Sequence, residues 1–185
     1  MIYLIIFLLN SILFAEQKYK EPQFKLLERI DNIEIRQYDE TIVAKTSISI
    51  DQDKSDNNMF RTLASYIFGN NQENKNIPMT APVTTFKNND SYEMLFYMLD
   101  SNSIDDLPDP INHDISFEKF NLDKCAVISF SWFVYDKKIL KYQRKLKNYL
   151  DKNSLVQDSP FMLNRYDPPW RLPFLRRNEI LVKIK

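Results

Sequence analysis

The stretch "IEIRQYDETIVAKTSIS", residues 33–49, decides the fold of this chain, because apolar and polar side chains alternate on both sides of a polar break at Asp39-Glu40. An alternation with a period of two predicts strands with one buried face, and the break predicts a turn, so the stretch predicts a β-hairpin. Residues 115–131, "ISFEKFNLDKCAVISFS", repeat the pattern, and each matching residue lies 82 positions later, as Ile115 does after Ile33. The sequence therefore predicts the same hairpin twice.

Each predicted hairpin is followed by a helical pattern and then by more strand material. In residues 57–69, "NNMFRTLASYIFG", apolar side chains recur at helical spacing, and Gly69 is expected to end the helix. Residues 136–150, "DKKILKYQRKLKNYL", have the same spacing and predict a second helix. Strand-like runs follow both helices: "APVTTF" and "YEMLFYML" after the first, "SPFMLNRY" and "EILVKIK" after the second.

The order of these patterns predicts the fold class. A unit of hairpin, helix and hairpin occurs twice, so the chain is expected to be α+β, with a duplicated ββαββ unit that forms a distorted antiparallel β-barrel flanked by two helices. One domain over residues 24–185 is expected, with internal repeats at about 30–99 and 112–185. The turn-rich residues 100–112, "DSNSIDDLPDPIN", are expected to link the two halves.

The N-terminus has a different character from the rest of the chain. Residues 1–15, "MIYLIIFLLNSILFA", carry no charge and include an apolar stretch of the length of a secretory signal. A cleaved signal peptide is the first interpretation and an uncleaved N-terminal anchor is the second, because a positive n-region is lacking. The first predicts a periplasmic or secreted protein, the second a membrane-anchored one.

Composition excludes several classes of function. The 25 basic and 25 acidic residues balance along the chain, so no basic face for nucleic acid is expected, and a single glycine excludes phosphate-cradling loops. His113 is the only histidine and lies where the linker meets a strand, which gives no catalytic or metal-ligating spacing. Cys125 is the only cysteine, and its apolar run "CAVISF" predicts a buried, unreactive thiol.

Four segments of the chain resemble the SOUL haem-binding protein family, and they occur in the family's order. They are "IEIRQYDETIVAKT", "FRTLASYIFGNNQENKNIPMTAPV", "YEMLFYML" and "LNRYDPPWRLPFLRRNEILVKI". The most specific pieces are "MTAPV", which follows a helix that ends in glycine, and the closing "RYDPPW" and "RRNEILVKI". The family's fold, a duplicated ββαββ unit in a distorted barrel with two helices, agrees with the repeat found from spacing.

The resemblance implies non-covalent binding of haem or a related tetrapyrrole. A porphyrin is a wide apolar disc with two carboxylates, so it needs an apolar platform with cations at its rim. Carried over by position, the resemblance implies a site made of Met59, Leu63, Ala64, Ile67, Met79 and Arg171. The alternative for the helix residues is an ordinary core stripe, and the alternative for Arg171 is a solvated loop arginine.

One departure from the family concerns the iron. Some relatives carry a histidine directly before the tyrosine of the first strand, whereas this chain has Gln37 before Tyr38. Haem is therefore expected to bind here without a histidine ligand, or with a methionine or tyrosine.

The absence of a catalytic constellation favours a non-enzymatic carrier for haem or porphyrin. Three alternatives stay open: a binding module for another apolar small molecule, a haem-modifying enzyme, and a protein-interaction module.

Overall fold

The computed structural model describes residues 19–50 and 56–185, so the interpretations of residues 1–15 concern a part of the chain outside this description. The strands are β1 (Phe24–Ile30), β2 (Ile33–Tyr38), β3 (Thr41–Ser49), β4 (Val83–Asn88), β5 (Ser91–Tyr97), β6 (Ser116–Phe120), β7 (Lys124–Phe130), β8 (Met162–Arg165) and β9 (Asn178–Lys183). The helices are α2 (Asp56–Ile67) and α3 (Asp136–Lys152), with short 3-10 turns η1 (Ile104–Asp106) and η2 (Pro173–Leu175).

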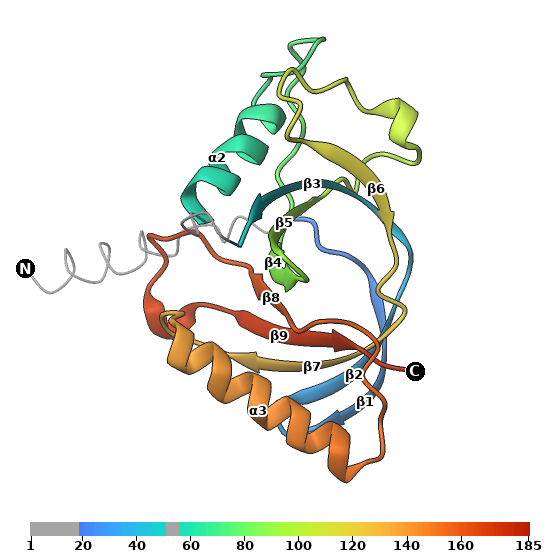
Figure 1. Cartoon of the computed structure of the whole chain (residues 1–185), viewed down its shortest axis with the longest axis vertical. Coiled ribbons are helices and arrows are strands. Elements are labelled where there is room, and N and C mark those ends of the chain that lie inside the picture. The colour runs from blue at the N-terminus through green and yellow to red at the C-terminus, as the bar shows by residue number, and fades with distance from the viewer. Residues whose placement is uncertain (1–18, 51–55) are drawn as a thin grey trace, which may run out of the picture.

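The nine strands form one antiparallel sheet in the order β1-β2-β7-β9-β8-β4-β5-β3-β6. The sheet curls into a half-barrel, with α2 at one end and α3 along the other (Figure 1). The predicted α+β class with a curled antiparallel sheet and two helices is confirmed. The curl is open, because β1 and β6 are the two edges of the sheet in the described part of the chain.

The two predicted hairpins over residues 33–49 and 115–131 are wrong, although their strands are where the alternation placed them. β2 pairs with β1 and β7, and β3 pairs with β5 and β6, so β2 and β3 do not pair across Asp39-Glu40. In the second predicted hairpin, β6 lies beside β3 and β7 lies beside β2, so these two strands do not pair either. Alternation reports which side of a strand is buried and not which neighbour it takes. The later strand pairs, β4 with β5 and β8 with β9, do form as predicted.

Both helices cover the same face of the sheet. The cross-strand partners Ile180, Leu163, Thr85 and Met94 follow one another from β9 to β5, and directly opposed residues point to the same side. The cluster around Ile180 and Leu163 contains the buried face of α3, and the cluster around Met94 contains that of α2. We call the other side, where Val127 and Leu95 lie, the helix-free face.

Gly69 ends α2 as the sequence predicts. Its φ is +97°, and the amides of Gly69 and Asn70 donate to the carbonyls of Tyr66 (3.2 Å) and Ser65 (2.9 Å). This pair of bonds is the Schellman ending, which needs a left-handed residue and therefore favours glycine. The chain then turns through residues 70–82 and starts β4 at Val83.

Neither described helix has the length and apolar character that crossing a bilayer requires. α3 is 17 residues long and is strongly two-sided, with Leu146 and Leu150 fully buried and lysines on its outer side. A ring stack between Phe130 and Tyr142, with centroids 4.2 Å apart, fixes α3 against β7.

Candidate functional site

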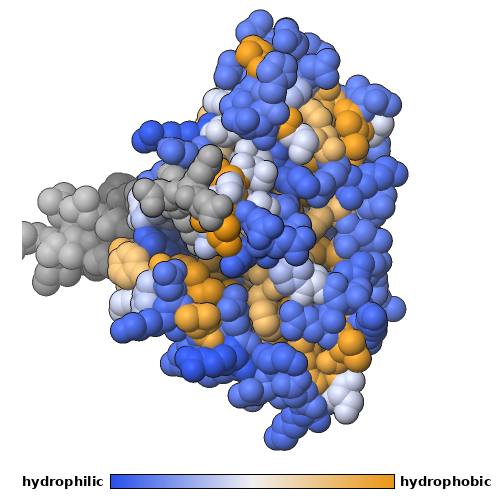
Figure 2. All heavy atoms as spheres, in the orientation of Figure 1, coloured by the Kyte–Doolittle hydropathy of each residue, from blue (hydrophilic) through white to orange (hydrophobic). Residues whose placement is uncertain are grey.

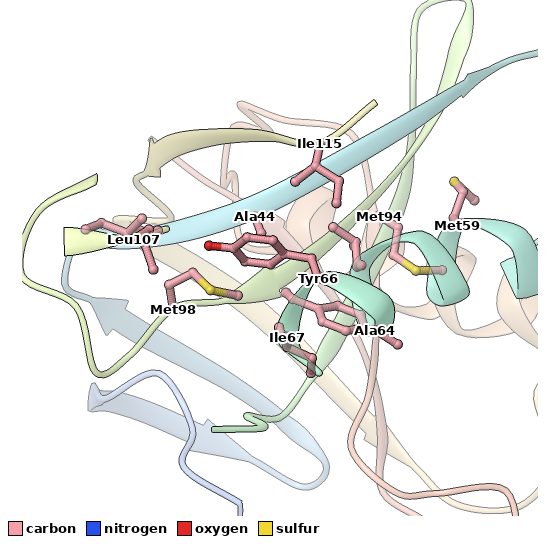
Figure 3. Packing of buried hydrophobic residues seen from close by; sticks show 12 residues of the cluster. Ala44, Met59, Ala64, Tyr66, Ile67, Met94, Met98, Leu107 and Ile115 are labelled. Atoms are coloured by element: carbon pink, nitrogen blue, oxygen red, sulfur yellow. The ribbon is translucent and has the colours of Figure 1, made fainter. Parts of the chain in front are cut away.

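The four α2 residues implied by the family resemblance lie in the hydrophobic core. Met59, Leu63, Ala64 and Ile67 are only 2%, 0%, 8% and 2% exposed. Figure 3 shows the α2 side chains gathered against the strands that carry Ala44 and Met94. As the structure stands, these side chains stabilise the packing of α2 and present no surface for a planar ligand.

Met79 joins the same cluster from the segment that precedes β4. It is half-buried and packs against the α2 core. The two residues that follow Met79 are fixed by hydrogen bonds. The Thr80 hydroxyl donates to the carbonyl of Tyr97 at 2.7 Å, and the Ala81 amide donates to the carbonyl of Lys20 at 2.9 Å. The Ala81-Pro82 peptide bond is cis.

Arg171 lies apart from that cluster, in the β8–β9 loop (residues 166–177). Its Nε lies 3.0 Å from Oδ1 of Asp167 and donates to the carbonyl of Leu175 at 3.2 Å. The structure therefore brings the five apolar residues together but places the arginine on a separate segment.

The β8–β9 loop carries an apolar surface that sequence reasoning missed. Four of its large apolar side chains are at least half exposed: Trp170 (80%), Leu172 (56%), Phe174 (55%) and Leu175 (51%). Internal bonds hold the loop in shape, since Asp167 accepts the amide of Arg177 at 2.5 Å and the Arg176 Nε donates to the carbonyl of Arg171 at 2.9 Å. In Figure 2 hydrophobic atoms gather on the side where Figure 1 draws this loop.

The start of α2 lies beside the start of this loop. Arg165, the last residue of β8, donates to Oδ2 of Asp56 at 2.9 Å and to the hydroxyl of Thr85 at 3.3 Å. Phe60, one turn into α2, is 38% exposed and places its ring 5.4 Å from that of Phe96. The Arg165–Asp56 contact thus ties the start of α2 to the residue at which the β8–β9 loop begins.

A second feature that the sequence did not reveal is a polar network on the helix-free face. Arg36 makes a two-point ion pair with Glu179, with N–O distances of 2.9 and 3.0 Å. Glu179 also accepts from the hydroxyls of Tyr166 at 2.7 Å and Ser129 at 3.3 Å, and Arg36 donates to the hydroxyl of Tyr38 at 2.9 Å. No single stretch signals this network, since Arg36 and Glu179 are 143 positions apart.

Burial and charge shift the ionisation of this network. Burial is the main cause that raises the pKa of the Tyr38 and Tyr166 phenols, and Glu179 adds to it. Burial alone would lower the pKa of Arg36, but hydrogen bonding and charge attraction by Glu179 outweigh it and raise that pKa. Arg36 therefore stays charged and the two tyrosines stay neutral across the physiological range.

A cavity of about 520 Å³ opens beside the network, lined by Tyr19, Lys20, Glu21, Pro22, Gln23, Phe24 and Arg177. Phe24 separates it from the ion pair, with the Arg36 guanidinium 4.3 Å from the centre of its ring. Arg177 lies 3.5 Å from the ring centre of Tyr166 and 2.5 Å from Glu21. The volume falls within the range of small-molecule sites.

The described residues contain few candidate ligands for the iron of a haem. They contain no group of three or more His, Cys, Asp or Glu side chains that could hold a metal ion. His113 is exposed in a turn before β6, and Cys125 is buried as predicted. Met59, Met94, Met98 and Met162 are each less than 5% exposed.

Comparisons with known proteins agree on the fold. The model of the SOUL heme-binding protein family matches residues 19–183. A search of curated proteins gave no match. Among solved structures, an uncharacterized conserved protein from Listeria innocua is similar at a TM-score of 0.60 and 10% identity, over 97% of this chain and 98% of that one.

Two other solved structures are similar at comparable levels. The EcmrR C-terminal domain has a TM-score of 0.61 at 12% identity, over 83% of this chain and 96% of its own. A hydrolase from Listeria innocua has a TM-score of 0.56 at 10% identity, over 97% of this chain and 98% of that one. At such identities the likeness concerns the fold alone.

Proposed function

Because the chain belongs to the SOUL heme-binding protein family, we propose that it binds haem or a related tetrapyrrole and carries it without transforming it. The observation that supports this most directly is the β8–β9 loop, where exposed Trp170, Leu172 and Phe174 lie beside Arg171 and Arg176. Aromatic and aliphatic side chains suit the porphyrin face, and guanidinium groups suit the propionates. We therefore place the ligand against this loop and the exposed edge of α2 at Phe60.

In this proposal the residues implied by family position take changed roles. Met59, Leu63, Ala64, Ile67 and Met79 support the site from beneath, by fixing α2 against the sheet. Arg171 pairs with a propionate in exchange for part of its contact with Asp167.

Iron coordination contributes little to affinity in this proposal. Gln37 stands where some relatives have histidine, and the described methionines other than Met79 are buried. Binding then depends on the porphyrin ring and its carboxylates, so haem and metal-free protoporphyrin should bind within about tenfold of each other.

Titration of the full chain with haem and with protoporphyrin, followed by the Soret band, tests the proposal. We expect saturable spectral shifts with both ligands, weakened by Trp170→Ala combined with Phe174→Ala. Val156→Ala, which changes a side chain that is 56% exposed and lies just after α3, is the matched control and should leave binding unchanged. No saturable shift with either ligand contradicts the proposal.

A propionate contact predicts a difference between ligands. Arg171→Ala should weaken haem more than an uncharged porphyrin ester, by about 1–3 kcal/mol if the contact is a charge-assisted hydrogen bond. Equal losses for both ligands count against that role for Arg171.

A non-enzymatic role is the simplest one for these residues. A hydrolase occurs among the similar structures, but at 10% identity it supports the fold alone. His113 is exposed in a turn and the Cys125 thiol is buried, so neither is placed as a nucleophile or base. Loss of the porphyrin chromophore on incubation would indicate a haem-modifying enzyme instead.

A second candidate function is binding of a different small molecule in the 520 Å³ cavity. Phe24 and Tyr19 give that cavity an aromatic lining, and Arg177 gives it a charge. Phe24→Ala separates the two functions: it should leave the haem titration unchanged if the tetrapyrrole lies on the β8–β9 loop, and abolish it if the cavity is the site.

We also propose that the fold arose by duplication of a ββαββ unit within one domain of residues 24–185. The elements β2-β3-α2-β4-β5 and β6-β7-α3-β8-β9 have the same order, which supports repeats at about 30–99 and 112–185. The sheet order from β2 to β6 also reads the same from either end when β2 is equated with β6, β3 with β7, β4 with β8 and β5 with β9.

An extracytoplasmic place, periplasmic or secreted, is part of the proposal. It rests on the uncharged apolar residues 1–15, with N-terminal membrane anchoring as the alternative. Comparing the mass of the mature protein with that of the full chain distinguishes cleavage from anchoring.

A further inference from the structure

The charges of this chain are segregated although its net charge is zero. α3 contains seven Lys or Arg and two Asp, whereas residues 100–114 contain five Asp and no Lys or Arg. In Figure 1 α3 lies at the lower end of the molecule, and the yellow-green stretch with residues 100–114 lies at the upper end. The balanced totals hide this separation, because the basic residues of α3 and the acidic residues 100–114 are each contiguous in sequence and lie at opposite ends of the fold (Figure 1).

The loop that leads into α3 exposes aromatic side chains next to these basic ones. Trp132, Phe133 and Tyr135 are 53%, 54% and 58% exposed, and Leu140 in the second turn of α3 is 54% exposed. Lys137, Lys141 and Arg144 are also exposed and share a helix side with Leu140, at spacings of three and four residues. We call these seven residues the aromatic-basic surface.

The exposed Trp132 has an unusual backbone conformation. Its φ is +76°, in the left-handed region that a bulky residue rarely adopts. Its amide donates to the carbonyl of Pro173 at 2.8 Å, and its carbonyl accepts from Nδ2 of Asn178 at 3.1 Å. These two bonds stabilise an exposed tryptophan where glycine would fit with less strain.

The neighbouring basic residue Lys138 is used differently. Its Nζ donates to the carbonyl of Ser131 at 2.7 Å and lies 5.6 Å from the ring centre of Phe130. It fixes the loop to α3, so the aromatic and basic parts of the surface are held together as one unit.

We propose that the aromatic-basic surface docks onto an anionic lipid bilayer, with the loop rings in the interfacial region and the lysines on the headgroups. Tryptophan, tyrosine and lysine or arginine are the side chains that membrane interfaces favour. The basic α3 complements anionic headgroups, and the acidic stretch at the other end is turned away from them. A surface attraction of this kind adds to a hydrophobic anchor, and residues 1–15 have the composition of one.

The two tryptophans of the chain allow a local test in the full-length protein. Trp170→Phe leaves Trp132 as the single tryptophan. Its emission should shift to the blue and be quenched by brominated lipid in vesicles of phosphatidylcholine mixed with phosphatidylglycerol. It should change little with vesicles of phosphatidylcholine alone. A Trp132 emission unchanged while the protein sediments with vesicles would mean that the contact is made without the loop rings, and would overturn the proposal.

Two triple variants test whether binding to anionic vesicles depends on the basic residues of α3. Changing Lys137, Lys141 and Arg144 to Gln should reduce partitioning onto the anionic vesicles about 100-fold. Changing the exposed Lys25, Lys75 and Lys87 to Gln removes the same charge elsewhere and should reduce it much less. Equal losses in the two triple variants, or no vesicle binding at all, contradict the proposal, and neither outcome bears on tetrapyrrole binding.

Discussion

Arg36 and Glu179 form an ion pair in the interior, with their side chains only 7% and 2% exposed. Glu179→Ala leaves the buried Arg36 with Glu34, 2.6 Å from its Nε, as its remaining carboxylate partner, so it should lower the free energy of unfolding by up to about 3–5 kcal/mol. Urea denaturation measures this loss. The double variant Arg36→Met with Glu179→Leu should lose less unfolding free energy than Glu179→Ala alone. A double variant whose loss equals the sum of the losses of its two single variants would contradict energetic coupling between Arg36 and Glu179.

Alkaline pH should destabilise the fold, because buried thiol and phenol groups keep their protons in the folded chain and release them in the unfolded chain. Burial raises the pKa of the Cys125 thiol from its ordinary 9.0 to about 12, and burial likewise raises the pKa of the Tyr97 phenol. Between pH 9 and 12 the unfolded chain has released the thiol proton that the folded chain retains. The contribution of this retained proton to the free energy of unfolding is thus fully present below pH 9. It decreases as pH rises above 9, by at most about 1.4 kcal/mol per pH unit.

Urea midpoints between pH 8 and 11 measure this decline. Cys125→Ala should lower stability at pH 8, since it removes a fully buried side chain, but should flatten the decline above pH 9. A midpoint that stays constant to pH 11 would contradict the buried state of these groups.

The packing of α3 can be tested with one buried and one exposed leucine of the helix. Leu146 is 0% exposed in the cluster with Ile180 and Val182, whereas Leu140 is 54% exposed. Leu146→Ala should cost about 2–5 kcal/mol of unfolding free energy, and Leu140→Ala about 0.5 kcal/mol or less. Similar costs at the two positions would show that α3 is docked through another face.

The left-handed ending of α2 predicts a cost for Gly69→Ala. A Cβ at this position would lie 3.2 Å from Oδ1 of Asn76, and φ of +97° is unfavourable for alanine. We expect a loss of about 1 kcal/mol in unfolding free energy, and a smaller loss for Gly69→Asn, because asparagine tolerates the left-handed region better. Thermal or urea unfolding of both variants checks this, and equal losses would exclude the conformational explanation.

The sequence predicted the helices and most strands because each has a regular pattern of buried positions. β1 was missed, since "FKLLERI" is exposed at all seven positions and has no alternation. Strand partners were beyond a pattern argument as well, because β2 buries the same side whether it pairs with β3 or with β7. Pairing depends on the whole sheet and not on a local signal.

The candidate site was harder to predict for a related reason. Helical spacing marks Leu63 and Ile67 as apolar in either a core or a platform, and only the fold shows that they are covered. Trp170 and Phe174 lie in a proline-rich loop where no periodicity reports exposure. A sequence cue did exist for the aromatic-basic surface: "WFVYDKK" places three aromatic residues directly before two lysines.

The exchange of strands between the two parts of the chain governs the order in which the protein is able to fold. Ile33 in β2 takes Ile128 as its partner, and Thr41 in β3 takes Phe120, so strands made early must wait for strands made late. Closing loops of this length slows folding, and among the strands before residue 100 only β1 with β2 and β4 with β5 are pairs that are local in sequence. A ribosome that delivers this chain from its N-terminus therefore releases a long unfinished sheet, which becomes complete only when β9 emerges.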